Sequence, residues 1–404
     1  MATPKRLGKY EILSTIGDGG MAVVYRARLQ AEIDGPRRAT KHVALKVIRS
    51  HLLERDELTG APDTDFSLMF VDEVRIAMGM SHRNVLQTFD AGTHDDQHFM
   101  VMEVVEGCSL RRLLATARAR DEQLPVELAL FIAIEVCGAL EYAHGFSAEG
   151  AATPGVVHRD VSPSNILLSR QGEVKLANFG VAKAAGRLAV SAAPLIKGKL
   201  SYMAPEQARG EVEARSDVFA LGAVLYEMCC GRPLRERADL DSVRIGTSVT
   251  APSKYRQELS GGLERIILDC LAKAPSARPS AAELKRRLSD EAFALQMKFG
   301  GSRDMHATLR EYIKMVGADE GDESSHQAGV AAGGPAGARS RRSADDGAAR
   351  IAAAMLEHAL AVPTDHGLEL SSVVQAPRPH DDDTVVDPSF DDRSFEEAKT
   401  AIVA

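Results

Sequence analysis

The sequence predicts an α+β fold in which β-strands come first and α-helices follow. Two observations lead to this class. Between residues 10 and 48, and again from Gln97 to Gly107, apolar and β-branched residues form short runs beside glycines, as strands do. From Ser109 onward apolar residues recur at helical spacing. Strands followed by helices, rather than alternating with them, indicate an α+β arrangement.

Composition limits the classes of function. The 404 residues can form one large or two average domains plus a tail, and 45% of them are hydrophobic, which is ample for a core. The net charge of -8 argues against nucleic acid as the main partner, because no basic stripe is present. Five cysteines without a C-x-x-C spacing favour reduced thiols over disulfides or a zinc site.

No targeting or membrane segment is evident. Residues 1–10 are polar and basic with no apolar segment behind them, so no secretory signal is expected. The longest apolar run, Val218 to Tyr226, is too short to span a bilayer. We therefore expect a cytoplasmic protein without a membrane span.

A glycine cluster interrupts the first strand pattern. Residues 10–28 alternate apolar and polar side chains on both sides of Gly17, Gly19 and Gly20, which predicts strand, tight loop and strand. No helix pattern follows the glycines, so a dinucleotide-binding loop of the Rossmann type is not favoured. A phosphate-covering loop and an ordinary hairpin turn both remain open on this pattern alone.

A single lysine stands in the next strand, His42 to Ile48. Lys46 lies in the middle of an apolar run, where a buried ammonium group is costly unless an anion meets it. The alternative is an edge strand with Lys46 in water. A helix is predicted over Asp65 to Met80, after a charged loop at residues 52–63.

Polar residues then gather on two loops. The stretch Val157-His158-Arg159-Asp160-Val161-Ser162-Pro163-Ser164-Asn165 follows a helix predicted over Pro125 to His144, and Asn178-Phe179-Gly180 comes thirteen residues later. A short hairpin is expected between the two loops. The arrangement would bring together one carboxylate and two amides.

These stretches resemble the H-R-D-x-x-x-x-N and D-F-G signatures of protein kinases. The chain looks most like the bacterial eukaryotic-like (Hanks-type) serine/threonine protein kinase family, and the resemblance spans about Tyr10 to Leu295. It implies a kinase domain at 10–297, with a small β-rich N-lobe (10–103) carrying one helix and a larger helical C-lobe (107–297). Residues 1–9 would be an N-terminal segment.

The resemblance also implies catalytic roles. Asp160 would accept or orient the proton of a substrate hydroxyl, and Lys46 would bind the α- and β-phosphates of ATP. Glu73 would be the ion-pair partner of Lys46, in competition with Glu57 and Asp72, which fit the family's spacing less well.

A metal site and a nucleotide site follow from the same resemblance. Asn165 and Asn178 would ligate Mg²⁺, with Mn²⁺ as the alternative. Met102 would flank the adenine, and the backbone of Glu103 and Val105 would bind its edge. The full set of nucleotide contacts implied is Ile16, Gly17, Asp18, Gly19, Gly20, Met21, Ala22, Val23, Val24, Ala44, Lys46, Met102, Glu103, Val105 and Leu167.

The chain departs from the family's pattern at several positions, including the stretch Gly198-Lys199-Leu200-Ser201, which lacks the usual Gly-Thr before the A-P-E motif. Asn178 replaces the aspartate of D-F-G, Ser162 replaces a lysine that meets the γ-phosphate, and Ala22 stands where a third glycine is usual. At an effective dielectric near 20, a unit charge 4 Å away is worth about 4 kcal/mol. Because about 1.4 kcal/mol corresponds to a decade of rate, Asn178 predicts a loss on the order of a thousandfold.

Three functions therefore remain open. The first is a protein kinase, weak or manganese-preferring, with serine/threonine specificity by resemblance and tyrosine or dual specificity not excluded. The second is a pseudokinase that binds nucleotide or a signalling partner without transferring phosphate. The third, a small-molecule kinase of related fold, is disfavoured by the Ala204-Pro205-Glu206 motif and by Asp217 at a helix start. In the family, Arg278 would pair with Glu206.

The remaining expectations concern regulation and the C-terminal part. Ser191 is the only hydroxyl residue between Gly180 and Gly198, so a phosphorylation switch with Arg159 as partner and an unregulated loop are both open. A helix is expected over 303–316, a linker over 318–347, a short helix over 348–362 and an acidic tail after it. Phosphorylated Thr384 is a candidate ligand for a phosphopeptide-binding partner.

Overall fold

The computed structural model describes ten stretches of the chain. The described residues are 6–19, 22–34, 37–49, 64–95, 97–147, 155–179, 200–235, 243, 249–299 and 304–327. The chain divides into two compact units, Met1–Arg342 and Ser343–Ala404. All described residues belong to the first unit. The predicted helix at 348–362, the acidic tail and Thr384 therefore lie outside them.

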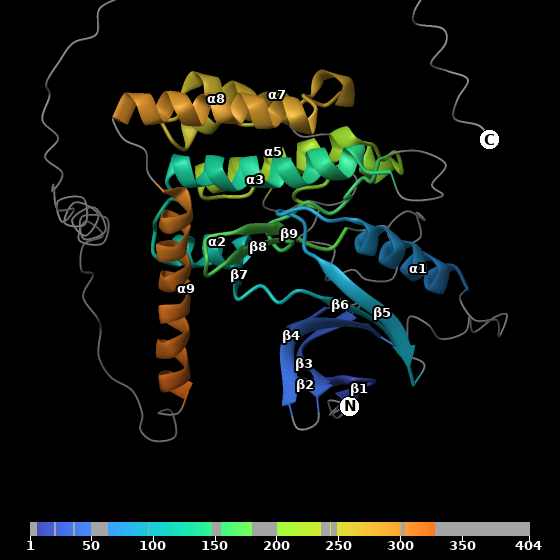
Figure 1. Ribbon diagram of the computed structural model, residues 1–404. Coiled ribbons are helices and arrows are strands. Elements are labelled where there is room, and N and C mark those ends of the chain that lie inside the picture. The colour runs from blue at the N-terminus through green and yellow to red at the C-terminus, as the bar shows by residue number, and fades with distance from the viewer. Residues whose placement is uncertain are drawn as a thin grey trace, which may run out of the picture. The chain divides into compact units, whose positions relative to one another are not determined.

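A six-stranded antiparallel sheet forms the N-lobe (Figure 1). Its spatial order is β1-β2-β3-β4-β6-β5. The strands are β1 (Arg6–Leu7), β2 (Tyr10–Asp18), β3 (Ala22–Asp34), β4 (Arg37–Ile48), β5 (Thr88–His94) and β6 (Gln97–Met102). The sheet agrees with the predicted α+β class and with the expected β-rich lobe.

Alternation along β4 places Lys46 on a particular face of this sheet. Val43, Leu45 and Val47 point into one apolar cluster. Ala44 and Ile48 point to the other face, where they pack with Met100 and Met102 of β6 and Phe70 of the following helix. Because side chains of a strand alternate with period two, Lys46 shares the face of Ala44 and Ile48. β4 lies between β3 and β6, so Lys46 is not on an edge strand.

The N-lobe helix α1 (Thr64–Gly79) ends in a joint with the C-lobe. In the joint, residues 82–86, the N–H of Leu86 donates to the carbonyl of Leu176 (2.9 Å) and the N–H of Leu176 donates to the carbonyl of Asn84 (2.7 Å). The Asn84 amide donates to Glu135 (2.7 Å) and to the carbonyl of Val174 (3.0 Å). The C-terminal end of α1 is thereby fixed to the larger lobe.

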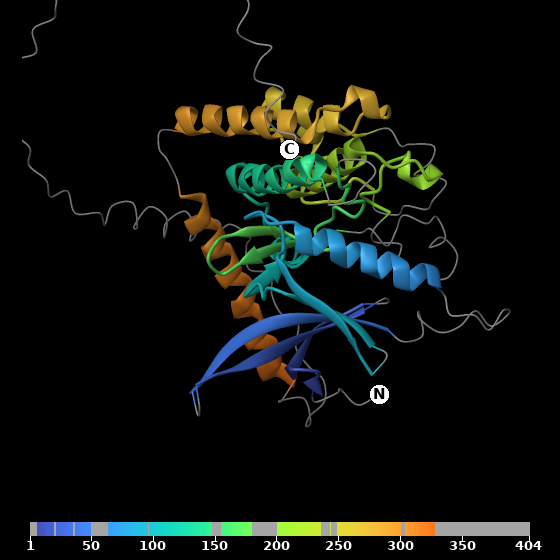
Figure 2. The same cartoon turned by 45° about the vertical axis from the view of Figure 1, so that its right-hand side comes forward.

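The C-lobe consists of helices around a small three-stranded sheet (Figure 2). Its helices are α2 (Leu110–Ala119), α3 (Val126–Gly145), α5 (Ala214–Cys230), α7 (Gly261–Cys270), α8 (Ala281–Phe299) and α9 (Met305–Gln327). The sheet is formed by β7 (Gly107–Ser109), β8 (Ile166–Ser169) and β9 (Val174–Leu176). The antiparallel pair β8–β9 is the hairpin expected between the two polar loops.

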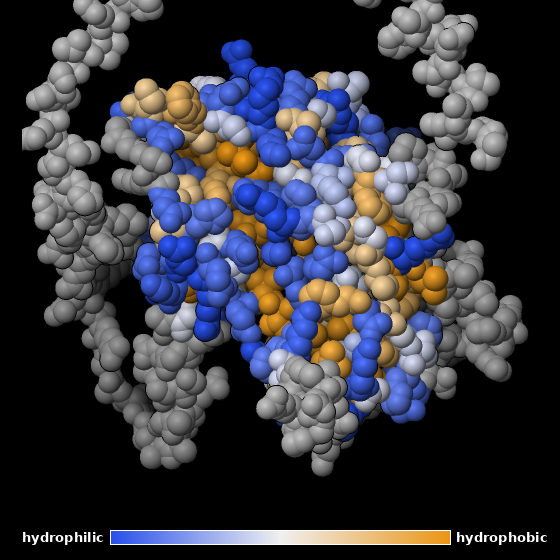
Figure 3. Space-filling model, viewed as in Figure 1, coloured by the Kyte–Doolittle hydropathy of each residue, from blue (hydrophilic) through white to orange (hydrophobic). Residues whose placement is uncertain are grey.

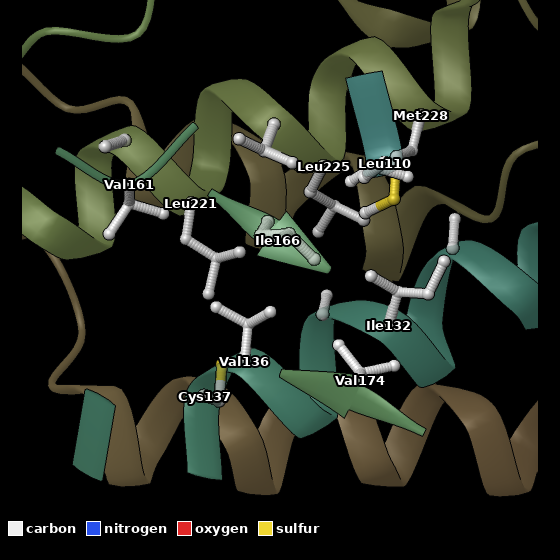
Figure 4. Packing of buried hydrophobic residues seen from close by; sticks show 14 of the residues in the cluster. Leu110, Ile132, Val136, Cys137, Val161, Ile166, Val174, Leu221, Leu225 and Met228 are labelled. Carbon is white, nitrogen blue, oxygen red and sulfur yellow. The ribbon is translucent and has the colours of Figure 1, made fainter. Parts of the chain in front are cut away.

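The C-lobe core lies between α3, α5 and β8 (Figure 4). Ile132 and Val136 of α3 meet Leu221 and Leu225 of α5, with Ile166 of β8 among them. All five side chains are fully buried. Burying an aliphatic side chain of this size stabilises the fold by about 1.5–3 kcal/mol, so this core provides a rigid support for the loops at the ends of β8 and β9.

Helix α9 is longer than the sequence pattern predicted. The predicted helix ended at residue 316, whereas α9 continues to Gln327, so the expected linker does not begin at residue 318. Leu309, Tyr312, Ile313 and Val316 are buried in the C-lobe core. The helix packs against α2, α3, β7 and β8, and it is therefore a structural part of the lobe.

The surface is mixed in polarity. On the face drawn in Figure 3, hydrophilic residues dominate the left side and hydrophobic residues gather in the lower half, over the N-lobe strands. Among the described helices, none combines the length and the apolar character needed to cross a bilayer.

Candidate active site

The structure brings Lys46 and Glu73 together. Lys46 Nζ lies 2.7 Å from Glu73 Oε1, and the side chains are only 16% and 10% exposed. The competing candidate Glu57 lies outside the described residues. A largely buried ammonium group needs such a partner, and the pair leaves further donors of Lys46 for a phosphate.

The loop at residues 157–165, which the resemblance makes the catalytic loop, places Asp160 beside Asn165. The Asn165 amide donates to the Asp160 carbonyl (2.7 Å) and to its carboxylate oxygen Oδ2 (3.0 Å). These bonds fix the orientation of a half-buried carboxylate. A carboxylate held in this way can accept a proton or a hydrogen bond from an alcohol.

Asn178 joins the same network. Its amide nitrogen Nδ2 donates to Asn165 Oδ1 (3.1 Å), so the three side chains form a chain from Asn178 through Asn165 to Asp160. An aspartate at position 178 would have no amide hydrogen to donate. The hydrogen bond is therefore specific to the departure noted in the sequence.

The carboxylate of Asp217 anchors the catalytic loop. Its carboxylate accepts from the backbone N–H groups of His158 and Arg159, each at 2.8 Å, and contacts His144 Nε2 at 2.9 Å. The sequence analysis placed Asp217 at a helix start but missed this anchoring role. The sequence shows a carboxylate at a helix start and a polar loop elsewhere in the chain. Only the tertiary structure shows that the two are in contact.

Two residues of the site hold left-handed backbone conformations. The φ angles are 66° at Arg159 and 61° at Asn178. For residues other than glycine this region is uncommon and costs of the order of 1–3 kcal/mol. The Asp217 hydrogen bond to the Arg159 N–H offsets part of that cost, and the packing of Phe179 on His158 (ring centroids 4.6 Å apart) supports the residue next to Asn178.

The segment after β6 is the one in which the adenine-binding hinge is predicted. Met102 is buried beside Ala44, and Val24 and Val104 pack on the same cluster. The N–H of Glu103 donates to the Gln87 carbonyl (2.9 Å), so this group is already used inside the protein. The Glu103 backbone, which the resemblance assigned to the adenine edge, is therefore left with its carbonyl for that contact.

Val105 and Leu167 complete the hinge side of the cleft. Val105 is half-buried directly after Val104, and Leu167 is half-buried on β8 between the fully buried Ile166 and Leu168. This alternation sends Leu167 to the opposite face of β8 from the core.

The glycine-rich loop joins β2 and β3 at one end of the sheet. Gly17 pairs with Val24 and Asp18 with Val23, and the N–H of Gly19 donates to the Ala22 carbonyl (3.0 Å). Ile16 is 52% exposed at the end of β2. Gly20 and Met21, also assigned to the nucleotide, lie outside the described residues.

A small cavity lies behind Met102. Its volume is about 20 Å³, enough for a water molecule but not for a purine. The residues around it are Lys46, Glu73, Ala77, Met80, Leu86, Thr88, Met100, Met102, Asn178 and Phe179. The cavity lies between the Lys46–Glu73 pair and Asn178.

Arg159 and Ser162 contain buried polar atoms that need partners. Within the described part of the chain, Nε and Nη1 of Arg159 and Oγ of Ser162 have no hydrogen-bond partner. Burial lowers the pKa of Arg159, while Asp217 acts in the opposite direction. Ser191, the predicted phosphorylation site, lies outside the described residues.

A buried ion pair fixes the Ala204-Pro205-Glu206 motif. Arg278 contacts the Glu206 carboxylate at 2.6 and 2.9 Å, and Ser216 donates to the same carboxylate at 2.7 Å. The Arg278 and Glu206 side chains are 0% and 3% exposed. This pairing is the one that the sequence analysis named.

The oxygen donors of the site suit a hard divalent cation. Asp160, Asn165 and Asn178 carry one carboxylate and two amide oxygens on side chains that are joined by hydrogen bonds from the amide nitrogens, and Mg²⁺ and Mn²⁺ prefer oxygen ligands. The site has less negative charge than one with aspartate at position 178. Within the described residues, no group of three or more His, Cys, Asp or Glu side chains forms a denser metal site.

A two-lobed α+β fold, a lysine–glutamate pair under a glycine-rich hairpin and an Asp–Asn catalytic loop together define a protein kinase. The protein kinase domain family matches residues 10–288, and the chain belongs to this family.

Bacterial kinases are among its relatives. The chain is 36% identical over 280 residues to the tyrosine-protein kinase MasK of Myxococcus xanthus, covering 68% of this chain and 42% of MasK. It is 34% identical over 299 residues to the serine/threonine-protein kinase PknB of Mycobacterium leprae, covering 71% of this chain and 44% of PknB. These relatives confirm the resemblance to the bacterial Hanks-type kinases. The chain matches less than half the length of either relative.

A solved structure confirms the fold. The kinase domain of PknI from Mycobacterium tuberculosis superposes with a TM-score of 0.53 at 26% identity, covering 72% of this chain and all of the PknI domain. The predicted two-lobed kinase fold is thus correct. The individual site roles stay predictions, because similarity of fold does not measure the contribution of any one side chain.

Proposed function

We propose that this protein transfers the γ-phosphate of ATP to hydroxyl side chains of proteins. The observation that carries the proposal is a continuous set of contacts: the Lys46–Glu73 pair lines the same cavity as Asn178, and Asn178 is hydrogen-bonded through Asn165 to Asp160. The named activities of MasK and PknB support the same reaction. Lys46 would bind the phosphates, and the hinge at residues 103–105 would bind the adenine.

Asp160 would act on the acceptor alcohol. Its carboxylate is oriented by Asn165 and the loop that bears it is anchored by Asp217. In kinases, catalysis is mainly positioning and electrostatic stabilisation, so the fixed orientation of Asp160 matters more than its basicity. The hydroxyl proton would pass to Asp160 as the oxygen attacks phosphorus.

Asn165 and Asn178 would hold a divalent ion, for which we propose Mg²⁺ or Mn²⁺. When bound, such an ion supplies positive charge to the phosphate oxygens. The hydrogen bond from Asn178 to Asn165 Oδ1 would have to break for both amide oxygens to face the ion. The need to break this hydrogen bond and the missing carboxylate charge at position 178 both support slow phosphate transfer. They also support a weak requirement for one particular metal.

Serine or threonine is the acceptor that we propose first. PknB is named a serine/threonine kinase and MasK a tyrosine kinase, and Ser162 removes the lysine that is typical of serine/threonine kinases. Tyrosine is therefore the second acceptor to test. We also propose the cytoplasm as the site of action, because ATP is present there and all five cysteines are free thiols.

Incubation with labelled ATP and either Mg²⁺ or Mn²⁺ tests the proposal. The proteins to compare are wild type, Asn178→Asp and Asp160→Asn, with phosphoamino-acid analysis of the products. We expect weak transfer by wild type, stronger transfer by Asn178→Asp and none by Asp160→Asn. If Asn178→Asp transfers phosphate and wild type transfers none, the protein is a pseudokinase and the proposal is wrong.

A further inference from the structure

Two arginines of α2 lie beside the catalytic loop. The backbone N–H of Arg111 donates to the Pro163 carbonyl (2.9 Å), three residues after Asp160. The buried face of α2 consists of Leu110, Leu113, Leu114 and Ala117. Arg111 and Arg118 are exposed and seven residues apart, so they share a different face of the helix.

The residues opposite this arginine face belong to the segment before the Ala204-Pro205-Glu206 motif. The Tyr202 hydroxyl donates to Glu227 Oε2 (2.5 Å). Burial and the nearby Glu227 raise the pKa of Tyr202, whereas the charges of Arg111 and Arg118 act in the opposite direction. Both guanidinium groups therefore lie near this phenol.

The segment and the catalytic loop are tied together. The Gln207 side chain donates to the Arg159 carbonyl (3.1 Å) and accepts from the Ala204 N–H (3.1 Å). The backbone of Arg111 and the segment that contains Tyr202 and Gln207 are thus both hydrogen-bonded to the loop that bears Asp160.

The surface around Arg111 and Tyr202 is positively charged. Glu227 is only 7% exposed, and it already accepts hydrogen bonds from Tyr202 and from Arg118 (3.1 Å). Arg111 is exposed and has no ion-pair partner among the described residues. The first turn of α2 has no acidic residue, and the helix dipole disfavours cations there, so Arg111 does not stabilise its own helix.

We propose that Arg111 selects protein acceptors with aspartate or glutamate beside the hydroxyl residue that is phosphorylated. The inference rests on the proposed function, because it concerns the acceptor of the same site. An acidic side chain next to the acceptor would pair with the free guanidinium group of Arg111. A basic side chain would face Arg111 and Arg118 and would be repelled.

Three peptides test the selection. They share one sequence with a single serine and differ only in its neighbours, which are aspartate, alanine or arginine on both sides. With the full chain we expect kcat/KM to be about tenfold higher for the aspartate peptide than for the arginine peptide, as two exposed charge contacts would give. Arg111→Glu should abolish or reverse the preference, and Arg111→Lys should keep it. The KM for ATP should stay unchanged.

Matched controls separate this inference from the proposed function. Arg286→Glu changes the same charge on an exposed arginine of α8 and should leave the peptide preference intact. Peptide binding to Asp160→Asn, with and without Arg111→Glu, is measured by fluorescence anisotropy and does not need catalysis. If no variant transfers phosphate, the proposed function is wrong. The peptide-binding measurements would still show whether Arg111 selects acidic peptides. Equal binding of the aspartate and arginine peptides, or a preference that survives Arg111→Glu, would overturn it.

Discussion

At the scale of single residues, the carboxylate of Asp217 organises the catalytic loop. It accepts hydrogen bonds from two backbone N–H groups of the loop. One of them belongs to Arg159, whose φ of 66° is otherwise unfavourable. The carboxylate therefore compensates for backbone strain close to Asp160. The orientation of the catalytic side chain depends on a residue that would not touch substrate.

We predict that Asp217→Ala lowers the rate of phosphate transfer more than it lowers affinity for ATP. The variant leaves buried N–H groups unpaired, at a cost of about 1–3 kcal/mol for each, so the free energy of unfolding should also decrease. Chemical denaturation and steady-state kinetics measure the two effects. Asp217→Asn, which keeps an oxygen acceptor, should lose less on both. Unchanged kcat in Asp217→Ala would contradict the anchoring role.

The buried pair Glu206–Arg278 makes stability depend on pH. Burial alone would raise the pKa of Glu206, but hydrogen bonds from Arg278 and Ser216 outweigh it, so the pKa lies below its ordinary value near 4.5. A carboxyl group whose pKa is lowered by folding stabilises the fold above its ordinary pKa. That stabilisation is lost as pH falls through the pKa of the folded state.

Replacing Glu206 with glutamine should show this dependence. At neutral pH we expect the free energy of unfolding to fall by about 3–5 kcal/mol, because Arg278 remains buried without its counter-charge. The difference between wild type and Glu206→Gln should shrink below about pH 4.5. Urea unfolding over a pH series measures it, and a difference that grows toward acid would have the wrong sign.

At the scale of elements, the sequence allowed most strands and helices to be predicted. The apolar run around Lys46 and the helical spacing around Glu73 are local signals. They led to both ends of α1 within one residue and to the end of β4 at Ile48, whereas β4 begins at Arg37, five residues before the predicted strand. The contact between the two side chains was expected from the resemblance. Asn178 was recognised as a departure, but its hydrogen bond to Asn165 was not, because tertiary packing decides which way an amide turns.

The length of α9 was the clearest error at this scale. Its apolar residues Leu309, Tyr312, Ile313 and Val316 have the spacing i, i+3, i+4, i+7 that marks a helix with one buried face. Beyond Val316 the sequence becomes acidic and rich in serine and glycine, which is typical of a linker. Helix propensity is a weak guide there, so the true end could not be placed from the pattern.

We predict that Leu309→Ala lowers the free energy of unfolding by about 2–5 kcal/mol. Leu309 is 0% exposed on α9, and truncating a buried leucine removes transfer energy and leaves a cavity. Lys314→Ala on the exposed face of the same helix is the control, with an expected change within about 0.5 kcal/mol. Equal stability of the two variants in urea would mean that α9 does not contribute to the lobe.

At the scale of the whole molecule, nucleotide binding should stabilise the folded state. ATP at 100 times its Kd should raise the free energy of unfolding by about 2.7 kcal/mol, because it binds only the folded protein. Lys46→Ala should lose most of this gain, since the phosphates lose their cation. Thermal unfolding with and without ATP, in EDTA and in Mg²⁺, gives the result. An equal gain in Lys46→Ala would place the nucleotide elsewhere.

The joint at residues 82–86 limits how the cleft can open. Backbone hydrogen bonds join the joint to Leu176, and the side-chain amide of Asn84 donates to α3 and β9. Together these bonds hold the C-terminal end of α1 on the large lobe. Glu73 is carried by α1 and Lys46 by the sheet strand β4. A rotation of α1 about this joint relative to the sheet would therefore separate the two side chains while the catalytic loop stays in place.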